Sequence, residues 1–519
     1  MPIFIYFLIL INSDGCMKQE IMEIALKRSI FIPSNELYSP TGGFYDYGYV
    51  GKALKRKLED FWRKFFLKRD GYLEIESVYI LPEVVLKASG HLSCFGDPVV
   101  ECTKCKKKFR ADHLLEEKTS GGFHDKRWEG MKPEQLTNEL KQRNLKCPEC
   151  GGALGEVGWF NLMFKTNIGP IEGTTGYLRP ETAQGIFLNF QRIFRSHGSK
   201  LPIGIAQIGK SFRNEISPRQ GLVRLREFSQ MELEYFFNPN SPTHPKFKEV
   251  ENEKFRVYTR EEQKKGSERC VELTARESVE KKIVPNEIMA YFMAREMQFY
   301  TKLGIPYDAL RFRHMLPEET PHYSGGNIDL EVKVSSGWVE VIGNAYRTDY
   351  DLRSHSKASG KDLSVLLEDG SKIIPHVVEP SFGVDRTLLC VLEHCYRKGG
   401  GAERRDWEWF DFPAFLSPFE VAVLPLMKKD GLDGKASEVA ERLREEGFDV
   451  FYDETGSIGK RYARQDEIGT PYCVTVDYQT LKDETVTVRF RNDGKQAREE
   501  IQKLPEKLWL FIKGNKLCL

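Results

Sequence analysis

The sequence predicts an α+β fold in which antiparallel strands with helices between them are followed by a smaller α/β domain. The chain has 519 residues, a length that favours two to four domains over a single core. Residues 204–213 and 226–237 alternate polar and apolar positions on either side of a turn, which predicts an antiparallel hairpin. After Ser417, strand patterns alternate with helix patterns, which is typical of one α/β domain.

Composition excludes several classes of protein. Lys and Arg number 77 against 76 Asp and Glu, so a surface that binds nucleic acid everywhere is excluded and any polyanion site must be local. With 40% hydrophobic and 12% aromatic residues, the chain is not disordered as a whole. The 11 cysteines include two CxxC pairs and are otherwise scattered. This pattern predicts a reduced intracellular chain, and we expect a cytoplasmic protein.

Residues 1–22 are predicted to be an apolar extension outside the domains. The run at residues 3–11 is too short for a bilayer span. The first interpretation is that it is the core of a signal peptide. The second is that it is a packed or frayed extension, or the result of a start codon placed too early, with Met17 or Met22 as the true beginning. We favour the second interpretation because no Lys or Arg precedes the run and no small-residue cleavage site follows it. No other segment approaches membrane length, so we expect no membrane partner.

The other elements follow in chain order. Apolar residues from Val50 to Phe66 recur at helical spacing after a glycine- and tyrosine-rich turn at 41–48. Within a domain at 23–400, we predict a Cys-bracketed insertion at 96–158 and a charged surface insertion at 238–300. Glycines at 398–402 indicate a linker to a domain at 417–519. That domain is predicted to contain strands at 419–424, 449–452, 472–478 and 485–491, and helices near 436–443, at 460–467 and from Gln496.

One phosphate-binding motif is rejected. Residues 204–211 match GxxxxGK[ST], but that loop requires a helix directly after it. Pro218 leaves little room for a helix, and the residues alternate as in a strand. We therefore interpret the segment as a strand.

Ionisable residues occur in segments that otherwise resemble buried strands. Arg213, Gln230, Glu232 and Glu234 share one face of the predicted hairpin with Phe228, and the alternative is a face exposed to solvent. Three further segments, at 179–184, 338–343 and 377–386, place charge beside apolar strands or helix starts. A carboxylate in an apolar strand is costly unless it is paired or binds a cation. Together these segments predict one polar floor for a ligand that carries an amine and phosphates.

These same residues resemble a known family. Residues 212–215 and 224–228 resemble motif 2 of class II aminoacyl-tRNA synthetases, and residues 383–386 resemble motif 3. The segments 43–48, 179–185 and 379–383 narrow the resemblance to glycyl-tRNA synthetases of the dimeric, archaeal and eukaryotic type. The resemblance implies a class II antiparallel sheet flanked by helices at 23–400 and an anticodon-binding domain at 417–519. It also implies a homodimer that ligates glycine to the 3′ end of tRNA(Gly) through glycyl-adenylate.

The resemblance also implies roles for individual residues. Arg213 and Arg386 would be catalytic, with Arg213 on the α-phosphate of ATP. Glu340 would bind the Mg²⁺ that bridges phosphates. The ATP-binding set is Arg213, Asn214, Glu215, Arg224, Leu225, Phe228, Glu340, Val341 and Arg386. The glycine-binding set is Glu181, Glu232, Glu379 and Ser381. Anticodon contacts would come from one cluster of Lys460, Arg461 and Arg464, together with Arg489 and Arg491. Without the resemblance, the first cluster would be interpreted as a solvated helix face.

Two CxxC pairs indicate a metal site. Cys102 and Cys105 form one pair, and Cys147 and Cys150 the other. Each pair can hold one metal ion from a tight turn, and four thiolates make a closed, structural Zn²⁺ site. The alternative is four ordinary reduced cysteines, which paired motifs within one insertion make less favourable.

Two other functions remain open at this point. The first is a class II synthetase for proline, threonine or histidine. The second is a catalytically silent subunit that binds structured nucleic acid. The presence of Arg213, Glu215, Glu340 and Arg386 together argues against the silent subunit, because a binding relic has no need of all four.

Overall fold

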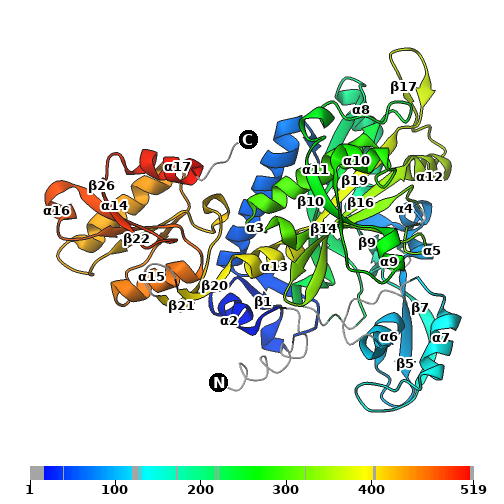
Figure 1. The fold of residues 1–519 in the computed structure, drawn as a ribbon, viewed down its shortest axis with the longest axis horizontal. Helices are drawn as coiled ribbons and strands as arrows, with labels where there is room; N and C mark the ends of the chain where they lie inside the picture. The colour runs from blue at the N-terminus through cyan, green and yellow to red at the C-terminus, as the bar shows by residue number, and fades with distance from the viewer. Residues whose placement is uncertain are drawn as a thin grey trace.

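The computed structural model describes residues 17–514 apart from 39, 120–127, 129, 171–172, 217, 219–220, 322 and 401–404. It contains a large body and a smaller C-terminal domain, coloured orange and red in Figure 1. Most of the predicted extension at 1–22 lies outside the described residues. The last residues of the extension are described: Ile21 and Met22 are buried in helix α2 (Gln19–Lys27). The predicted boundary of the extension is therefore wrong at this end.

A mainly antiparallel sheet, in which only the pairs β10–β3 and β12–β14 are parallel among the described residues, forms the centre of the large body. In the part of the chain that the structure describes, it has nine strands in the order β13-β12-β14-β15-β16-β19-β11-β10-β3. The predicted hairpin is confirmed as β10 and β11, and residues 204–211 lie in a strand rather than a phosphate-binding loop. The bounds are β3 (Leu73–Glu74), β10 (Ile203–Phe212), β11 (Glu227–Phe237), β12 (Lys254–Tyr258), β13 (Val271–Thr274), β14 (Leu310–His314), β15 (Asn327–Val334), β16 (Gly337–Thr348) and β19 (His376–Gly383).

Long helices supply much of the main apolar core that packs on this sheet. They include α3 (Tyr49–Trp62), α11 (Glu287–Lys302) and α13 (Val384–Cys395). Phe61 of α3 stacks on Phe299 of α11 at 5.0 Å between ring centroids. The predicted helix at 50–66 is confirmed, with a π-helical end at Arg63–Lys68. The turn predicted before it is partly a strand, because β2 (Tyr45–Tyr47) pairs with β1 (Phe31–Pro33).

The prediction of a surface insertion at 238–300 is wrong. Strands β12 and β13 extend the central sheet at one edge, and most side chains of α11 are buried. Phe255, Val257 and Leu273 supply the apolar face of these short strands, while charged residues occupy the exposed face and the loops. The high charge of the segment concealed this alternation. Two short helices, α9 (Arg260–Lys264) and α10 (Ala275–Glu280), complete the region.

Residues 96–158 form a separate unit with its own sheet and core, drawn in blue and cyan at the lower right of Figure 1. Strand β5 (Gly96–Cys102) pairs with both β6 (Lys108–Arg110) and β7 (Leu154–Asn161). Helices α6 (Ala111–Thr119) and α7 (Pro133–Gln142) accompany the sheet. Because this unit carries both CxxC pairs, we call it the cysteine subdomain.

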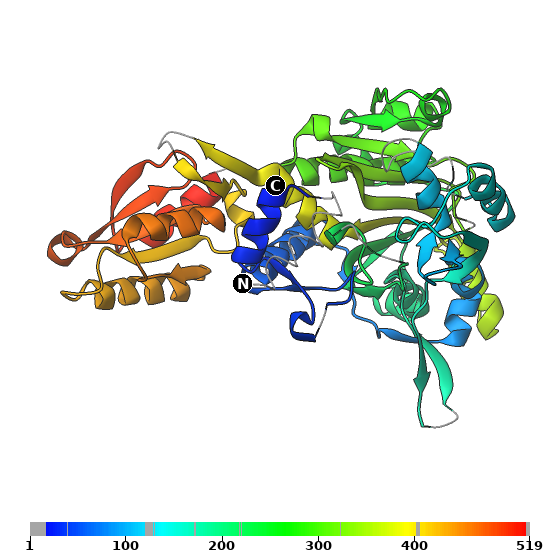
Figure 2. The ribbon, with the colours of Figure 1, turned by 90° about the horizontal axis from the view of Figure 1, so that it is seen from below.

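A second small sheet combines β4 (Ile80–Pro82), β8 (Lys165–Ile168) and β9 (Thr174–Leu178). The hairpin of β8 and β9 projects from the body in Figure 2. Helix α4 (Glu83–Ala88) contacts β4 and β9, and it also packs against α5 (His91–Cys94) and α12 (Tyr350–Ser359). Helix α8 (Ala183–Ser196) contacts α12, β10 and β11, and β17 (Val365–Leu366) pairs with β18 (Lys372–Ile373). Within the described ranges, no helix combines the length and apolarity needed to cross a bilayer.

The C-terminal domain has the predicted α/β character. Its sheet runs β23-β22-β24-β25-β26, and its members are β22 (Val421–Pro425), α14 (Leu432–Glu445), β23 (Val450–Tyr452), α15 (Ile458–Glu467), β24 (Tyr472–Val476), α16 (Thr480–Asp483), β25 (Thr485–Phe490), β26 (Gln496–Glu500) and α17 (Leu504–Gly514). Two details correct the prediction. Gln496 begins a strand rather than a helix, and residues 398–400 belong to a hairpin of β20 (Tyr396–Gly400) and β21 (Arg405–Phe410) rather than a free linker. In both places, backbone pairing outweighs local composition.

Candidate active site

The predicted site residues meet in one cavity of about 530 Å³ on the face of the central sheet. Of the residues predicted to bind ATP or glycine, those that line it are Glu181, Arg213, Glu215, Arg224, Leu225, Phe228, Glu232, Glu340, Val341, Glu379, Ser381 and Arg386. Asn214 is not among the lining residues, and its N–H donates to the carbonyl oxygen of Leu162 at 2.7 Å. The cavity holds two groups of opposite charge.

Arg213 belongs to the cationic group and is positioned by aromatic rings. Its guanidinium lies 5.2 Å from the ring centroid of Phe95 and 5.1 Å from that of Phe228. Nε donates to the carbonyl oxygen of Pro180 at 3.2 Å. These contacts orient the cation without neutralising it, so its charge stays available to an anionic ligand.

Arg386 and Arg224 complete the cationic group. Arg386 lies in the first turn of α13 and donates to the carbonyl oxygens of Val223 at 2.9 Å and Glu340 at 3.0 Å. Its Nη1 also lies 3.2 Å from the half-exposed Glu340 carboxylate. Arg224 Nε lies 3.9 Å from the carboxylate of Glu215. Three guanidinium groups therefore face one cavity, an arrangement suited to phosphate oxygens.

The anionic group is held together by hydrogen bonds. Glu232 Oε1 accepts the Ser381 hydroxyl at 2.6 Å, and its Oε2 accepts the N–H of Thr182 at 2.8 Å. Glu181 accepts the side-chain amide of Gln184 at 2.9 Å, and His91 Nε2 lies 3.5 Å from its other oxygen. All three of the carboxylates at 181, 232 and 379 were predicted from the sequence.

Arg347, which was not predicted, joins the carboxylates of Glu181 and Glu379. Arg347 is almost fully buried and donates to Glu379 at 2.6 Å, to Asp351 at 2.8 Å and to Glu181 at 3.4 Å. A buried carboxylate cluster needs such a cation, because each unpaired charge would carry a large desolvation cost. Arg347 therefore sets the geometry of the anionic group.

Two irregularities in β16 explain why Arg347 was missed. The register with β15 shifts by one residue at Val341, so Glu340 faces the cavity together with Gly343 and Ala345. Strict alternation from Glu340 would instead have placed Ile342 and Asn344 there. A second shift, between β16 and β19, leaves Arg347 as the extra residue of a bulge. The one sequence signal for a paired arginine is the acidic residue Asp351, four positions after Arg347.

Burial and charge pull the carboxylate pKa values apart. Burial raises the pKa of Glu379 to about 7, although Arg347 acts against it. Burial and the neighbouring Glu379 hold the pKa of Glu234 well above its usual range, and burial also raises the pKa of Glu232. For Glu181, burial is outweighed by Arg347 and His91, which lower its pKa. The raised pKa values show that one arginine does not compensate this many buried carboxyl groups, so a cation bound beside them would favour their ionised forms.

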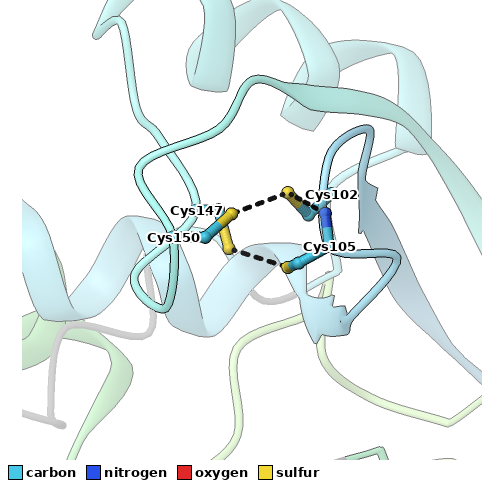
Figure 3. A group of neighbouring side chains, drawn as sticks. All are labelled: Cys102, Cys105, Cys147 and Cys150. Carbon is cyan, nitrogen blue, oxygen red and sulfur yellow. Dashed lines mark hydrogen bonds between the residues drawn. The ribbon is translucent and has the colours of Figure 1, made fainter.

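The four predicted metal ligands also converge, within the cysteine subdomain. Figure 3 shows the two CxxC pairs facing each other. Cys102 Sγ lies 3.6 Å from Cys150 Sγ, Cys105 Sγ lies 3.6 Å from Cys147 Sγ, and all four ligand atoms are within 4.8 Å of one another. Tetrahedral Zn²⁺ with Zn–S bonds of about 2.3 Å separates its sulfurs by about 3.8 Å. A Cβ at Gly152 would lie only 3.1 Å from Cys102 Sγ, so the cradle requires glycine there. The donor set therefore fits Zn²⁺.

The predicted anticodon contacts need correction. Arg489 is buried and pairs with Asp466 at 2.9 Å, Arg491 is buried against backbone carbonyls such as Phe412 O, and Arg461 donates to Gly456 O at 2.6 Å. Buried and paired in this way, these three arginines cannot reach RNA. Arg464 is partly exposed but pairs with Asp453 at 2.6 Å, whereas Lys460 is exposed. The sequence pattern of alternating charge did not distinguish internal ion pairs from surface charge.

Comparison with known proteins agrees with the fold and the site. Residues 170–395 match the family described as tRNA synthetase class II core domain (G, H, P, S and T), and residues 420–509 match the anticodon binding domain. The antiparallel sheet, its arginine-lined cavity and the second domain thus define a class II aminoacyl-tRNA synthetase.

Curated relatives narrow this class. The chain is 42% identical to the protein of Pyrococcus abyssi named glycine–tRNA ligase, over 96% of this chain and 99% of the relative. It is 43% identical to the glycine–tRNA ligase of Pyrococcus furiosus with the same coverage, and 40% identical to that of Methanocaldococcus jannaschii over 94% and 98%. The chain belongs to the glycine–tRNA ligase family, which confirms the predicted fold class and family.

Proposed function

We propose that this protein ligates glycine to tRNA(Gly) in two steps within the cavity described above. In the first, the glycine carboxylate attacks the α-phosphorus of ATP, which forms glycyl-adenylate and releases pyrophosphate. In the second, the 3′-terminal adenosine hydroxyl of the tRNA attacks the adenylate carbonyl and AMP leaves. The observation that carries the proposal is the meeting of three arginines with three hydrogen-bonded glutamates in one cavity.

The residues would act by positioning and charge stabilisation. Arg213 would hold the α-phosphate and stabilise the charge that develops there. Arg386 and Arg224 would hold the remaining phosphates, while Phe228 stacks on the adenine and Glu215 accepts its amino group. No side chain needs to form a covalent bond, because the reaction needs aligned reactants more than a protein nucleophile.

The anionic group would bind the ammonium of glycine. Glu181, Glu232 and Glu379 supply negative charge, and Ser381 is fixed against Glu232. Glycine has no side chain to attract, so selection must depend on excluding any Cβ. A tightly hydrogen-bonded cluster can do this because moving one carboxylate would break the contacts of the others.

Two metal ions belong to the proposal. Glu340, a half-exposed carboxylate beside Arg386, would bind the Mg²⁺ that accompanies ATP, because Mg²⁺ prefers oxygen ligands. Zn²⁺ would be held by Cys102, Cys105, Cys147 and Cys150 and would link the two CxxC pairs of the cysteine subdomain. A closed four-thiolate site has no open position for substrate, so zinc would have a structural role only.

We also infer a cytoplasmic homodimer. Val78, Tyr79, Ile80 and Val84 are exposed in and around β4, next to the projecting β8–β9 hairpin. An apolar patch of this kind supports contact with a second copy of the chain. Sedimentation velocity on the purified protein would give the oligomeric state.

Amino-acid-dependent exchange of label between pyrophosphate and ATP tests the function directly. Glycine should support exchange, whereas proline, threonine and histidine, the substrates of the nearest alternative enzymes, should not. A silent subunit would give no exchange with any amino acid. Exchange with one of the other three would assign a different specificity.

Glycine binding should weaken as the pH falls below about 7. Burial raises the pKa of Glu379 to about 7, and a bound ammonium would favour its ionised form. Binding should therefore release protons near neutral pH, and the KM for glycine should rise by up to about tenfold per pH unit on the acid side. Calorimetry in two buffers with different ionisation enthalpies measures the release. Glu379→Gln should remove it, and an unchanged release in that variant would contradict this assignment.

Purified protein should contain about one zinc ion per chain. Cys105→Ser should lower the zinc content and the thermal stability of the cysteine subdomain, because the remaining thiolates cannot complete the coordination shell. Cys94→Ser is the matched control, since Cys94 is exposed and outside the cluster. Equal zinc content in all three proteins would show that the four cysteines do not bind it.

A further inference from the structure

The cysteine subdomain reaches the nucleotide half of the cavity through α6. His113, in the first turn of this helix, contacts Arg224 across a large sequence separation. Arg224 Nη1 lies 3.4 Å from Nδ1 and 3.2 Å from Nε2 of the imidazole. The cysteine subdomain is therefore in direct contact with one of the three arginines that face the cavity.

The two distances define the type of contact. A donor in the imidazole plane can approach one ring nitrogen closely, but it cannot lie almost equally far from both without overlapping the carbon between them. Nη1 therefore lies over the face of the ring, as in a cation–π contact. The ring limits the side-chain freedom of Arg224, and the Glu215 carboxylate lies 3.9 Å from Nε of the same guanidinium.

A buried ion-pair network holds His113 in place. Arg110, at the end of β6, donates to Asp97 at 2.9 Å and to Asp112 at 3.1 Å. Asp112 in turn accepts the backbone N–H of His113 at 3.0 Å. All three residues of this network are largely buried, so the start of α6 is rigidly attached to β5 and β6.

The same helix is part of the core that contains the cysteines. Leu114 and Leu115 of α6 pack in the apolar cluster that includes Cys102 and Cys147. The path from the cysteines to the cavity is thus short and continuous: the cluster, α6, His113 and Arg224. An insertion with no role in the site would not need the first turn of α6 to contact a residue that lines the cavity.

We propose that His113 is a positioning residue for ATP, through which the cysteine subdomain orients Arg224 toward the phosphates. This inference rests on the proposed function, because it assigns a nucleotide role to Arg224. In the absence of the ring, Arg224 would sample several rotamers and lose part of that freedom only when ATP binds.

The test compares ATP affinity with glycine affinity in the full-length protein. His113→Ala should raise the KM for ATP in pyrophosphate exchange by about three- to thirtyfold, the range expected for a guanidinium on an aromatic face. The KM for glycine and the kcat should stay within about twofold of wild type, since the anionic group is untouched. Isothermal calorimetry with ATP alone should show the same loss of affinity.

Two variants separate positioning from a general loss of structure. His113→Phe keeps a ring face and should restore most of the ATP affinity. Lys107→Ala, which removes an exposed pair with Glu149 at 2.8 Å in the same subdomain, should leave ATP affinity unchanged. An unchanged KM for ATP in His113→Ala would overturn the inference, as would an equal rise in both KM values.

The outcomes also distinguish this inference from the proposed function. One outcome is that wild-type protein supports glycine-dependent exchange while His113→Ala has the same KM for ATP as wild type. That result would support the proposed function and reject the positioning role of His113. If wild-type protein shows no exchange, the proposed function falls, and the calorimetric comparison with ATP still decides the role of His113.

Discussion

Arg213→Ala is expected to reduce glycine-dependent pyrophosphate exchange by at least about 10²- to 10³-fold, the loss typical of removing one preorganised charge donor from a transition state. Arg213 is held by Phe95, Phe228 and the carbonyl oxygen of Pro180, so its orientation costs nothing further when the reactants meet. The deficit should appear mainly in kcat, because the charge it stabilises grows as the new bond to phosphorus forms. Exchange assays at saturating ATP and glycine measure it.

Arg192→Ala is the matched control for this variant. Arg192 lies on the exposed side of α8 and contributes to no part of the cavity. It should retain wild-type exchange, and both variants should unfold at nearly the wild-type temperature. Retention of more than about a tenth of the exchange by Arg213→Ala would contradict the assignment of the α-phosphate contact to this residue.

Arg347→Met is expected to destabilise the protein by about 3–5 kcal/mol and to abolish detectable glycine binding. Arg347 is the cation shared by Glu181, Asp351 and Glu379, and its removal leaves these buried carboxylates without the positive charge that they share. Acidic groups will take up protons in response, which removes the negative charge that would attract an ammonium. Thermal unfolding and calorimetry with glycine measure the two effects.

Arg353→Met gives the comparison at the surface. Arg353 is 67% exposed in its pair with Asp349, and an exposed ion pair contributes about 0–1 kcal/mol. A second variant, Arg347→Met combined with Glu181→Gln and Glu379→Gln, should recover part of the stability but not glycine binding, because it removes unpaired charge and the ligand contacts together. Full stability of Arg347→Met alone would show that the carboxylates do not depend on this cation.

Most residues of the site could be predicted because their signals are local. Arg213, Arg224 and Phe228 stand in a strand-turn-strand pattern, and Glu379 with Arg386 stands where a strand runs into a helix. Period-two alternation places such side chains on one face without reference to distant contacts. The CxxC spacing is local in the same way, because each pair forms its own tight turn.

The errors occurred where backbone register or burial decided the outcome. Arg347 lies in a bulge of β16, so alternation counted from Glu340 gives the wrong face. Arg489 and Arg491 were predicted to bind RNA, yet each fills the interior of the C-terminal domain. The charged segment at 238–300 contains a core helix and two edge strands. In each case the sequence shows the charge of a side chain, but it does not show the residues that surround that side chain in the fold.

The amino-acid sequence by itself determined the two main domains and the hairpin β10–β11, because both depend on neighbours a few residues away. Its motifs also determined the family, and that resemblance implied the groups expected to touch ATP and glycine. Only the tertiary structure decided that Arg347 joins the carboxylates and that His113 of the cysteine subdomain lies under Arg224. These contacts join residues far apart in the chain, and their geometry follows from strand register and domain packing. Neither is encoded in local spacing, since a shift of one residue turns a side chain to the opposite face of a sheet.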